Sequence, residues 1–295
     1  MSTALPAPAS SKTSSTSYEQ RHGRFTVAGA KAYLSENVNP DLSTYPLAAY
    51  CFMTGYIDIL SFSAIFLWCG FQTGNSAQLA IALARLFQTQ PDGSHDTSFR
   101  LPDRFALCSL LSFVAGAFVG RVGDKMGAKT RGWLALGTAL QALMTMAASV
   151  AIWKSGQLSI SNERDLPAWS DVDAFVCVAF MSASLGLQGI MGKRVNTQFA
   201  TTIVLTTVWC ELMADPKLFQ FRCMVITRDH KLFAVFALFL GAFVGRAILQ
   251  STSAAVTLGI GTGIRLLIAL SWLFVPAKTA PTKTDGAKPG SKAGA

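Results

Sequence analysis

Long runs of apolar residues alternate with short polar stretches along this chain. Six of the runs approach the roughly 17–25 residues that a helix needs to cross a bilayer, namely 46–68, 105–122, 133–153, 174–192, 232–249 and 256–275. Two further runs, 76–87 and 199–212, are shorter, and such lengths are typical of re-entrant or buried half-helices. The pattern predicts an all-α membrane protein with about six transmembrane helices.

The composition supports a membrane protein. Hydrophobic residues make up 51% of the 295 residues and charged residues only 14%, against roughly 25% charged residues in soluble domains. Residues 1–44 and 277–295 flank the apolar region, and their Ser, Thr, Ala, Pro and Lys content predicts disordered tails. The N-terminus weakly resembles a mitochondrial presequence, but Glu19 and Glu36 count against that reading. We expect the net charge of +9 to meet lipid headgroups of the bilayer rather than nucleic acid.

The charges between the runs predict the topology. The linker 121–131 is basic, with Arg121, Lys125, Lys129 and Arg131 against Asp124, whereas the loop 154–173 is acidic. The segment 193–231 and the C-terminal tail are also basic, so the positive-inside rule makes them cytoplasmic with the linker. Six spans and two cytoplasmic termini satisfy this pattern if both short runs return to their starting side. Eight spans would place the basic linker outside. We therefore favour six spans. We expect the protein to lie in the plasma membrane rather than in an organelle.

The chain also repeats itself. Residues 116–121 read GAFVGR, and residues 241–246 read the same. A second, partial match aligns Leu136-Gly137-Thr138 with Ile260-Gly261-Thr262. These matches predict a duplicated unit of about 125 residues, giving membrane repeats at 45–153 and 174–276. Each unit reads as one span, one short broken helix and two spans. An odd number of crossings inverts the second unit, as in many secondary transporters. The repeated glycines are assigned to close helix packing, and they are Gly116, Gly120, Gly241 and Gly245.

Two charges lie inside apolar runs. Asp58 is near the middle of the first run and Arg265 near the middle of the last. A charge at that depth costs at least about 2.5–3.5 kcal/mol and normally finds a partner inside the protein, so we expect the two to neutralise each other. In the repeat alignment Arg265 corresponds to Gln141, and Asp58 to about Gly189. A switchable ion pair, a proton-coupling or cation-binding carboxylate, and a static bridge or backbone bond all remain open.

The short runs begin with polar residues. Residues 70–78 contain Thr73, Gly74 and Asn75, and residues 196–207 of the second unit are rich in hydroxyl groups. Non-helical backbone at membrane depth must be buried in protein or line a wet cavity. Thr73 and Asn75 could cap the following helix and present its positive end to an anion. An interfacial turn is the alternative, but polar breaks in both halves favour a shared polar cavity.

Several motifs resemble one known family. The chain has Gly-Tyr-Ile-Asp at 55–58, Ser-Phe at 61–62, Thr-Gly-Asn at 73–75 and Gly-Leu-Gln at 186–188. This set resembles the YoaK-like multipass membrane proteins, catalogued as domain of unknown function 1275, over about residues 45–275. The resemblance implies a membrane protein and no established activity. The chain departs from the pattern at Gly189 and at Leu205-Thr206, so the resemblance supports first-half positions better than second-half ones.

The sequence does not favour an enzyme. The 3 histidines lie in loops or the tail, the 6 cysteines form no Cys-x-x-Cys pair, and no metal, cofactor or nucleophile–base pattern stands out. We therefore expect a transporter or permease for a small polar or anionic solute, with a non-transporting scaffold or accessory subunit as the alternative. Its candidate solute-binding residues are Asp58, Thr73, Gly74, Asn75, Gln188 and Arg265.

Overall fold

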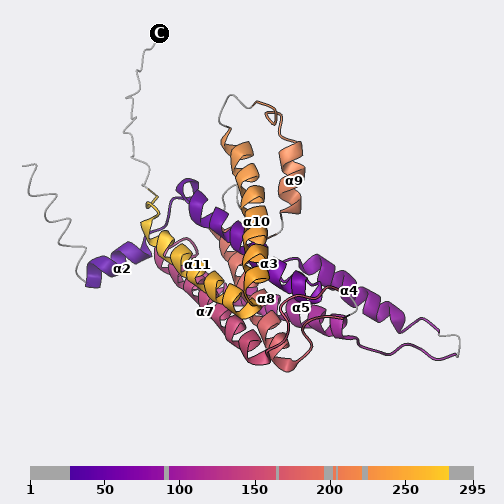
Figure 1. Cartoon of the computed structure of the whole chain (residues 1–295). Helices are drawn as coiled ribbons and strands as arrows, with labels where there is room; N and C mark the ends of the chain where they lie inside the picture. Colours follow the sequence, from indigo (N-terminus) through magenta and orange to yellow (C-terminus); the bar gives the residue numbers. More distant parts are fainter. Residues whose placement is uncertain are drawn as a thin grey trace, which may run out of the picture.

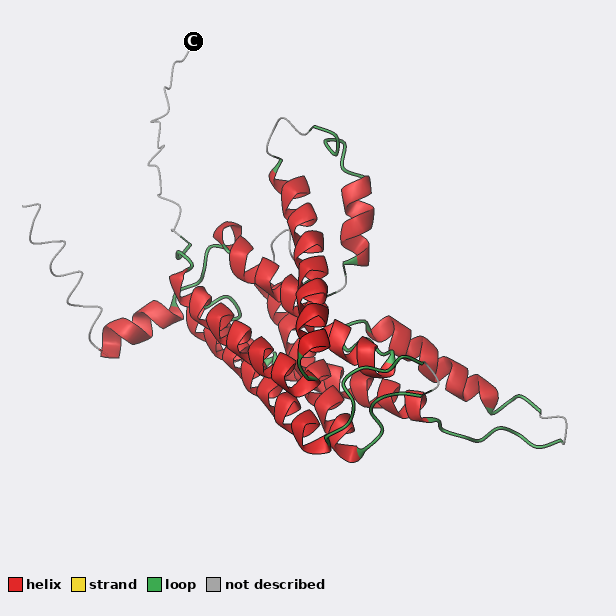
Figure 2. Cartoon of the chain, viewed as in Figure 1, coloured by secondary structure: helices red, strands yellow, loops and turns green. Residues whose placement is uncertain are grey.

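The computed structural model describes residues 27–89, 93–163, 166–195, 202–203, 205–220 and 225–278. These residues form helices joined by loops, with no strand among them (Figure 2). Six helices are long and apolar enough to cross a membrane: α3 (Thr44–Ile65), α5 (Leu101–Val119), α7 (Arg131–Ser155), α8 (Val172–Val195), α10 (Ile226–Ser251) and α11 (Ala254–Phe274). The shorter helices are α2 (Val27–Ser35), α4 (Gln72–Arg85), α6 (Val122–Met126) and α9 (Thr206–Met213) (Figure 1). The predicted all-α class with six spans is confirmed for this part of the chain.

Local signals explain where the long helices start and stop. The side chain of Thr130 caps α7 by accepting a hydrogen bond from the backbone N–H of Trp133 at 3.3 Å. Ser253 caps α11 in the same way. α7 ends at Gly156, whose φ of 65° suits glycine. α3 ends at Phe66, which takes a φ of 55° that non-glycine residues rarely adopt. The chain therefore turns sharply after α3 and folds back along it.

Glycines bring α3 and α10 into close contact. A Cβ on Gly55 would lie 2.0 Å from the carbonyl oxygen of Leu238, and one on Gly241 would lie 1.9 Å from the carbonyl oxygen of Phe52. Further along, Gly245 faces Tyr56. Residue numbers rise together along the two helices, so α3 and α10 run parallel. The packing role predicted for Gly241 and Gly245 is confirmed.

The same arrangement joins α5 and α8. A Cβ on Gly186 would lie 2.0 Å from the carbonyl oxygen of Phe113, and one on Gly116 would lie 2.0 Å from the carbonyl oxygen of Ala183. A Cβ on Gly120 would meet the side chain of Ile190 at 2.1 Å. α5 and α8 are therefore also parallel, and the packing role of Gly116 and Gly120 is confirmed. Gly116, Gly120 and Gly186 thus make the same close contacts between α5 and α8 as Gly241, Gly245 and Gly55 make between α10 and α3.

One end of the bundle gathers segments that are far apart in sequence. The backbone N–H of Val38, before α3, donates to the carbonyl of Lys129, before α7, at 2.9 Å. The N–H of Asn39 donates to the carbonyl of Pro276, after α11, at 2.8 Å. We call this the basic end, because it holds the linker 121–131. α3 and α7 start here, and α11 ends here.

The segment before α3 corrects one prediction. Residues 1–44 were expected to be a disordered tail, yet Val27–Ser35 is helical and Val38 is fully buried. Arg131 explains this order, because it donates to the carbonyl of Val275 at 2.9 Å, pairs with the carboxylate of Glu36 and stacks on the ring of Tyr33. Residues 1–26 and 279–295 lie outside the described residues, so the tails predicted there are not tested.

The loop between α7 and α8 closes the opposite end. Its Ala168 N–H donates to the carbonyl of Ala64 near the end of α3 at 2.8 Å, and its Ser159 hydroxyl accepts from the N–H of Ala254 at 2.9 Å. Trp169 in this loop is fully buried. We call this the acidic end. α8 and α11 begin here, and α5, parallel to α8, begins here as well.

α4 is a half-helix that enters from the acidic end and returns to it. Near its start, Gln72 donates to the hydroxyl of Ser109, which lies more than two turns into α5. Near its end, Arg85 pairs with Asp103 in the first turn of α5. α4 therefore runs antiparallel to α5, from mid-depth back towards the acidic end, as expected for a re-entrant element.

α9 has the corresponding relation to the basic end. Glu211 of α9 pairs with Lys231 near the start of α10 at 3.4 Å, and α9 stands beside α10 (Figure 1). Just before α9, Thr202 packs against Gly192 of α8. The predicted short run 199–212 becomes helix only at Thr206. Residues 196–201, which carry part of the predicted polar break, lie outside the described residues.

Candidate functional site

Asp58 lies on α3 about two turns before the helix ends. Its side chain is 1% exposed. Oδ1 accepts a hydrogen bond from the backbone N–H of Gly70 at 2.7 Å, and Oδ2 has no hydrogen-bond partner. The bond to Gly70 holds the chain that turns back after Phe66 against α3. It therefore positions the start of α4 at the depth of Asp58.

Arg265 lies on α11 and is fully buried. One terminal nitrogen donates to the side-chain oxygen of Gln141 on α7, and the other donates to the hydroxyl of Ser184 on α8 at 3.3 Å. Nε has no hydrogen-bond partner. The guanidinium thus bridges two neighbouring helices through neutral groups.

Asp58 and Arg265 do not form the ion pair that we expected from the sequence. Among the described residues, no carboxylate oxygen lies within 4.0 Å of the Arg265 guanidinium, and no cationic nitrogen lies that close to Asp58. The prediction of mutual neutralisation is wrong for a geometric reason. Asp58 turns towards the loop that leads to α4, whereas Arg265 reaches between α7 and α8.

Asn75 is the centre of a buried polar network. It is 5% exposed, and its amide donates to the hydroxyl of Ser109 on α5 at 3.1 Å and to the side chain of Gln72 at 2.9 Å. The Ser109 hydroxyl is in turn 2.8 Å from that of Ser182 on α8. The network ties α4 to α5 and α8. Sequence reasoning missed both serines, whose only signal was a hydroxyl within an apolar run.

Thr73 and Gly74 lie differently from what we predicted. Both are exposed, and a Cβ on Gly74 would meet nothing within 4 Å. The helix begins at Gln72, so the N-cap position is Phe71, and no side chain caps it. The predicted capping by Thr73 and Asn75 is therefore wrong, because both residues lie inside the first turn.

Gln188 connects α8 to α3 and to the second broken segment. Its amide nitrogen donates to the carbonyl of Tyr50 and to the hydroxyl of Thr54, each at 2.9 Å. Thr54 donates to the carbonyl of Thr202 at 2.9 Å. The oxygen of the Gln188 amide and the hydroxyl of Thr202 are buried without a partner. α8 carries Ser182, Ser184 and Gln188. Through these side chains it takes part in the polar contacts of the Asn75 network, of Arg265 and of Thr54.

The two broken segments meet at Ile203. A Cβ on Gly70, in the first segment, would lie 2.8 Å from Oδ2 of Asp58 and 3.3 Å from the side chain of Ile203. A Cβ on Gly189 of α8 would lie 2.7 Å from the same isoleucine. Ile203 therefore fills the space between α8 and the loop that Asp58 holds. An apolar side chain stands at this contact, where the sequence suggested a polar cavity.

Comparison with models of protein families shows to which family this chain belongs. The family model described as "Protein of unknown function (DUF1275)" matches residues 47–271, from the start of α3 to the end of α11. The chain belongs to the DUF1275 family. No curated protein and no solved structure matches it. With its six candidate spans, this DUF1275 member is a multipass membrane protein.

A pocket of about 500 Å³ opens beside the first broken segment of the DUF1275 chain. Aromatic side chains and two amides line it, including Phe62, Phe66, Trp68, Asn75 and Gln78. Gly74 and Pro102, at the starts of α4 and α5, complete the wall. Because Asn75 also belongs to the buried network, the pocket reaches the polar interior from the acidic end.

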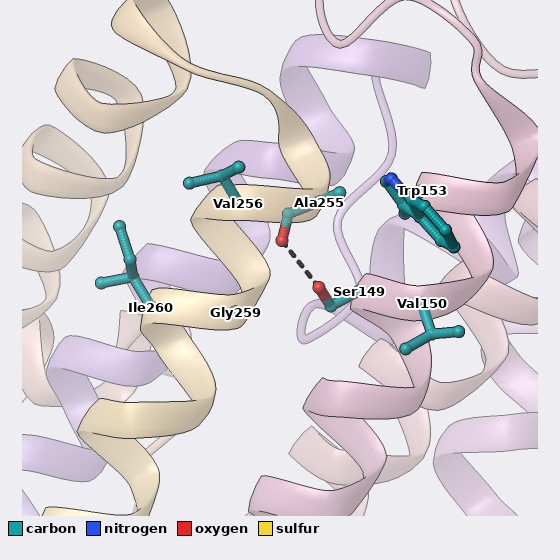
Figure 3. Close-up of a pocket in the computed structure, with 7 residues that line it drawn as sticks. All are labelled: Ser149, Val150, Trp153, Ala255, Val256, Gly259 and Ile260. Carbon is teal, nitrogen blue, oxygen red and sulfur yellow. Dashed lines mark hydrogen bonds between the residues drawn. The ribbon is translucent and has the colours of Figure 1, made fainter.

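A second hollow lies between α7 and α11, with a volume of about 480 Å³. Figure 3 shows its lining, in which the Ser149 hydroxyl donates to the carbonyl of Ala255 at 2.7 Å, and Val150, Val256 and Ile260 supply apolar surface. None of the candidate solute-binding residues lines it. We therefore take the pocket beside Asn75, rather than this groove, as the approach to the candidate site.

Proposed function

We propose that this DUF1275 protein moves a small polar or anionic solute across the bilayer through the region where its two broken segments meet. The observation that carries the proposal is the contact of Ile203 with Gly70 and Gly189. The loop before α4 reaches this point from the acidic end, and Thr202 and Ile203, which precede α9, pack there against α8. Transporters commonly place the solute where such discontinuous helices meet near the bilayer midplane.

The helix directions support an inverted repeat as part of this proposal. α3 starts at the basic end, while its counterpart α8 starts at the acidic end. α5 and α10 run opposite ways, because each is parallel to the partner that its glycines contact. α7 and α11 also run opposite ways, since α7 starts at the basic end and α11 ends there. We propose that the two units are related in this inverted sense, with both termini in the cytoplasm and the plasma membrane as the site. Rocking of one unit against the other would then expose the centre alternately.

Four of the six candidate residues have a defined part in this scheme. Asp58 positions the first broken segment through Gly70, and its second oxygen is available for a proton or a solute. Gln188 offers an unpartnered amide oxygen next to the second segment. Asn75 and Gly74 line the pocket through which a solute would approach from the acidic end. If the two segments separated at Ile203, the pocket beside Asn75 would be connected with the free oxygens of Asp58 and Gln188.

The test is transport by the purified protein in lipid vesicles, after a thermal-stability screen of a solute library chooses the solute. Asp58→Asn is the decisive variant, since an amide oxygen still accepts the Gly70 N–H while the charge is removed. We expect normal folding and loss of transport. Asp103→Asn is the matched control, because Asp103 is also buried but pairs with Arg85. It should lose thermal stability and keep transport per folded molecule.

The scaffold alternative is favoured by one observation, which is that the Asp58 side chain bonds to the backbone of the loop before α4, accepting from the N–H of Gly70. Such a bond could serve purely to fix the loop. In that case Asp58→Asn should mainly lower protein yield. A library in which no solute stabilises the wild-type protein at any pH would reject transport and leave the scaffold.

A further inference from the structure

Arg265 differs from the other buried arginines of the described structure. Arg131 and Arg228, each 4% exposed, pair with the carboxylates of Glu36 and Asp229. Arg265 is 0% exposed and has only the neutral side chains described above as partners. A buried charge with no opposite charge is strongly unfavourable, and inside a membrane water cannot compensate for it.

The surroundings of Arg265 offer donors in excess of acceptors. The amide nitrogen of Gln141 donates to the sulfur of Met191 at 3.3 Å, and a thioether accepts weakly. Nε of Arg265 has no acceptor at all. This pattern of groups suits a negatively charged ligand.

We infer that a small monovalent anion binds beside Arg265, between α7, α8 and α11. Nε of Arg265 and the amide nitrogen of Gln141 are the donors that hold it, while Ser184, whose hydroxyl donates to the carbonyl of Met181, keeps the guanidinium in place. One monovalent anion balances the charge of Arg265. The enclosed position selects a halide or a small oxyanion such as nitrate, formate or bicarbonate over sulfate or a larger organic acid. The inference rests on the proposed function insofar as it names the solute class, but equilibrium binding does not require transport.

The experiment measures the thermal midpoint of full-length protein in detergent at constant ionic strength, with sodium gluconate replaced stepwise by chloride, nitrate, formate or sulfate. We expect a rise of about 5–10 °C for a monovalent ion at roughly 100 times its dissociation constant, and none for sulfate. Equilibrium dialysis of the effective ion should give a stoichiometry near one per chain.

Gln141→Glu is the sharpest variant, because it places a carboxylate where Arg265 already bonds to an amide oxygen. It should raise the midpoint in gluconate and abolish the response to the anion. Arg265→Gln should abolish the response as well. Arg131→Gln is the control for removal of a buried arginine, and it should lower the midpoint and keep the full response, because Arg131 has its own carboxylate.

The inference is overturned if no small anion shifts the wild-type midpoint, or if the shift persists in both Gln141→Glu and Arg265→Gln. Uptake of the same ion into vesicles separates this result from the proposed function. Saturable binding without uptake would refute transport and leave the anion site intact. Uptake of a neutral solute by a protein that binds no anion would refute the anion site alone.

Discussion

Gly241→Ala should be among the most damaging single-methyl changes in this protein. A Cβ at Gly241 would stand 1.9 Å from the carbonyl oxygen of Phe52, whereas real Cβ atoms essentially never come closer than 3.0 Å. The obstacle is backbone, so no side-chain rotation can relieve it, and α3 and α10 must separate. Overpacking of this kind costs typically about 1–3 kcal/mol, and we take the upper value because two helices must move. The helix preference of alanine over glycine returns about 1 kcal/mol.

The net loss is therefore about 2 kcal/mol, which corresponds to a midpoint lower by roughly 4–8 °C for a chain of this size. The assay is thermal unfolding of detergent-purified protein followed by size-exclusion chromatography. Gly263→Ala is the matched control, since Gly263 lies inside α11 and a Cβ there would meet nothing within 4 Å. That control should melt at or slightly above the wild-type temperature. If the two variants melt together, the close approach of α3 and α10 is not real, and the helix directions argued from it fail.

Three further predictions test the ends and the network. Cysteines placed at Gln88 and Glu163 in a cysteine-depleted background should react with an impermeant maleimide from one side of the membrane, and a cysteine placed at Lys125 should react from the other side. If Gln88→Cys is labelled from the same side as Lys125→Cys, α4 crosses the membrane. Trp169→Ala should cost about 3–5 kcal/mol in thermal unfolding, because a fully buried ring that holds the loop over α3 is removed. Ser109→Ala should cost about 1–3 kcal/mol in the same assay, since it removes the hydroxyl to which Asn75, Gln72 and Ser182 are bonded; an unchanged midpoint would contradict the network.

The spans and their packing could be predicted from the sequence because they depend on local pattern. Apolar length fixes the six long helices, and the repeated glycines at 116 and 241 mark the close contacts, since few other causes place glycine at such spacing inside a span. The partner of Asp58 could not be predicted this way. It is the backbone N–H of Gly70, and a backbone group leaves no signal in the choice of side chain.

The pairing of Arg265 shows a different limit. Gln141 and Arg265 were assigned to equivalent positions of the two proposed units, and the structure places them in contact with each other. In the proposed inverted arrangement, residues near the twofold axis would meet their own counterparts, so the alignment was consistent with this contact. The expectation that opposite charges pair pointed to Asp58 instead. Asp58 corresponds to Gly189, and there the missing side chain leaves room for Ile203. Each buried charge is thus met by dipoles of its own surroundings rather than by the other charge. Because the two are separate, a solute that binds at either one should respond to substitution of that residue alone.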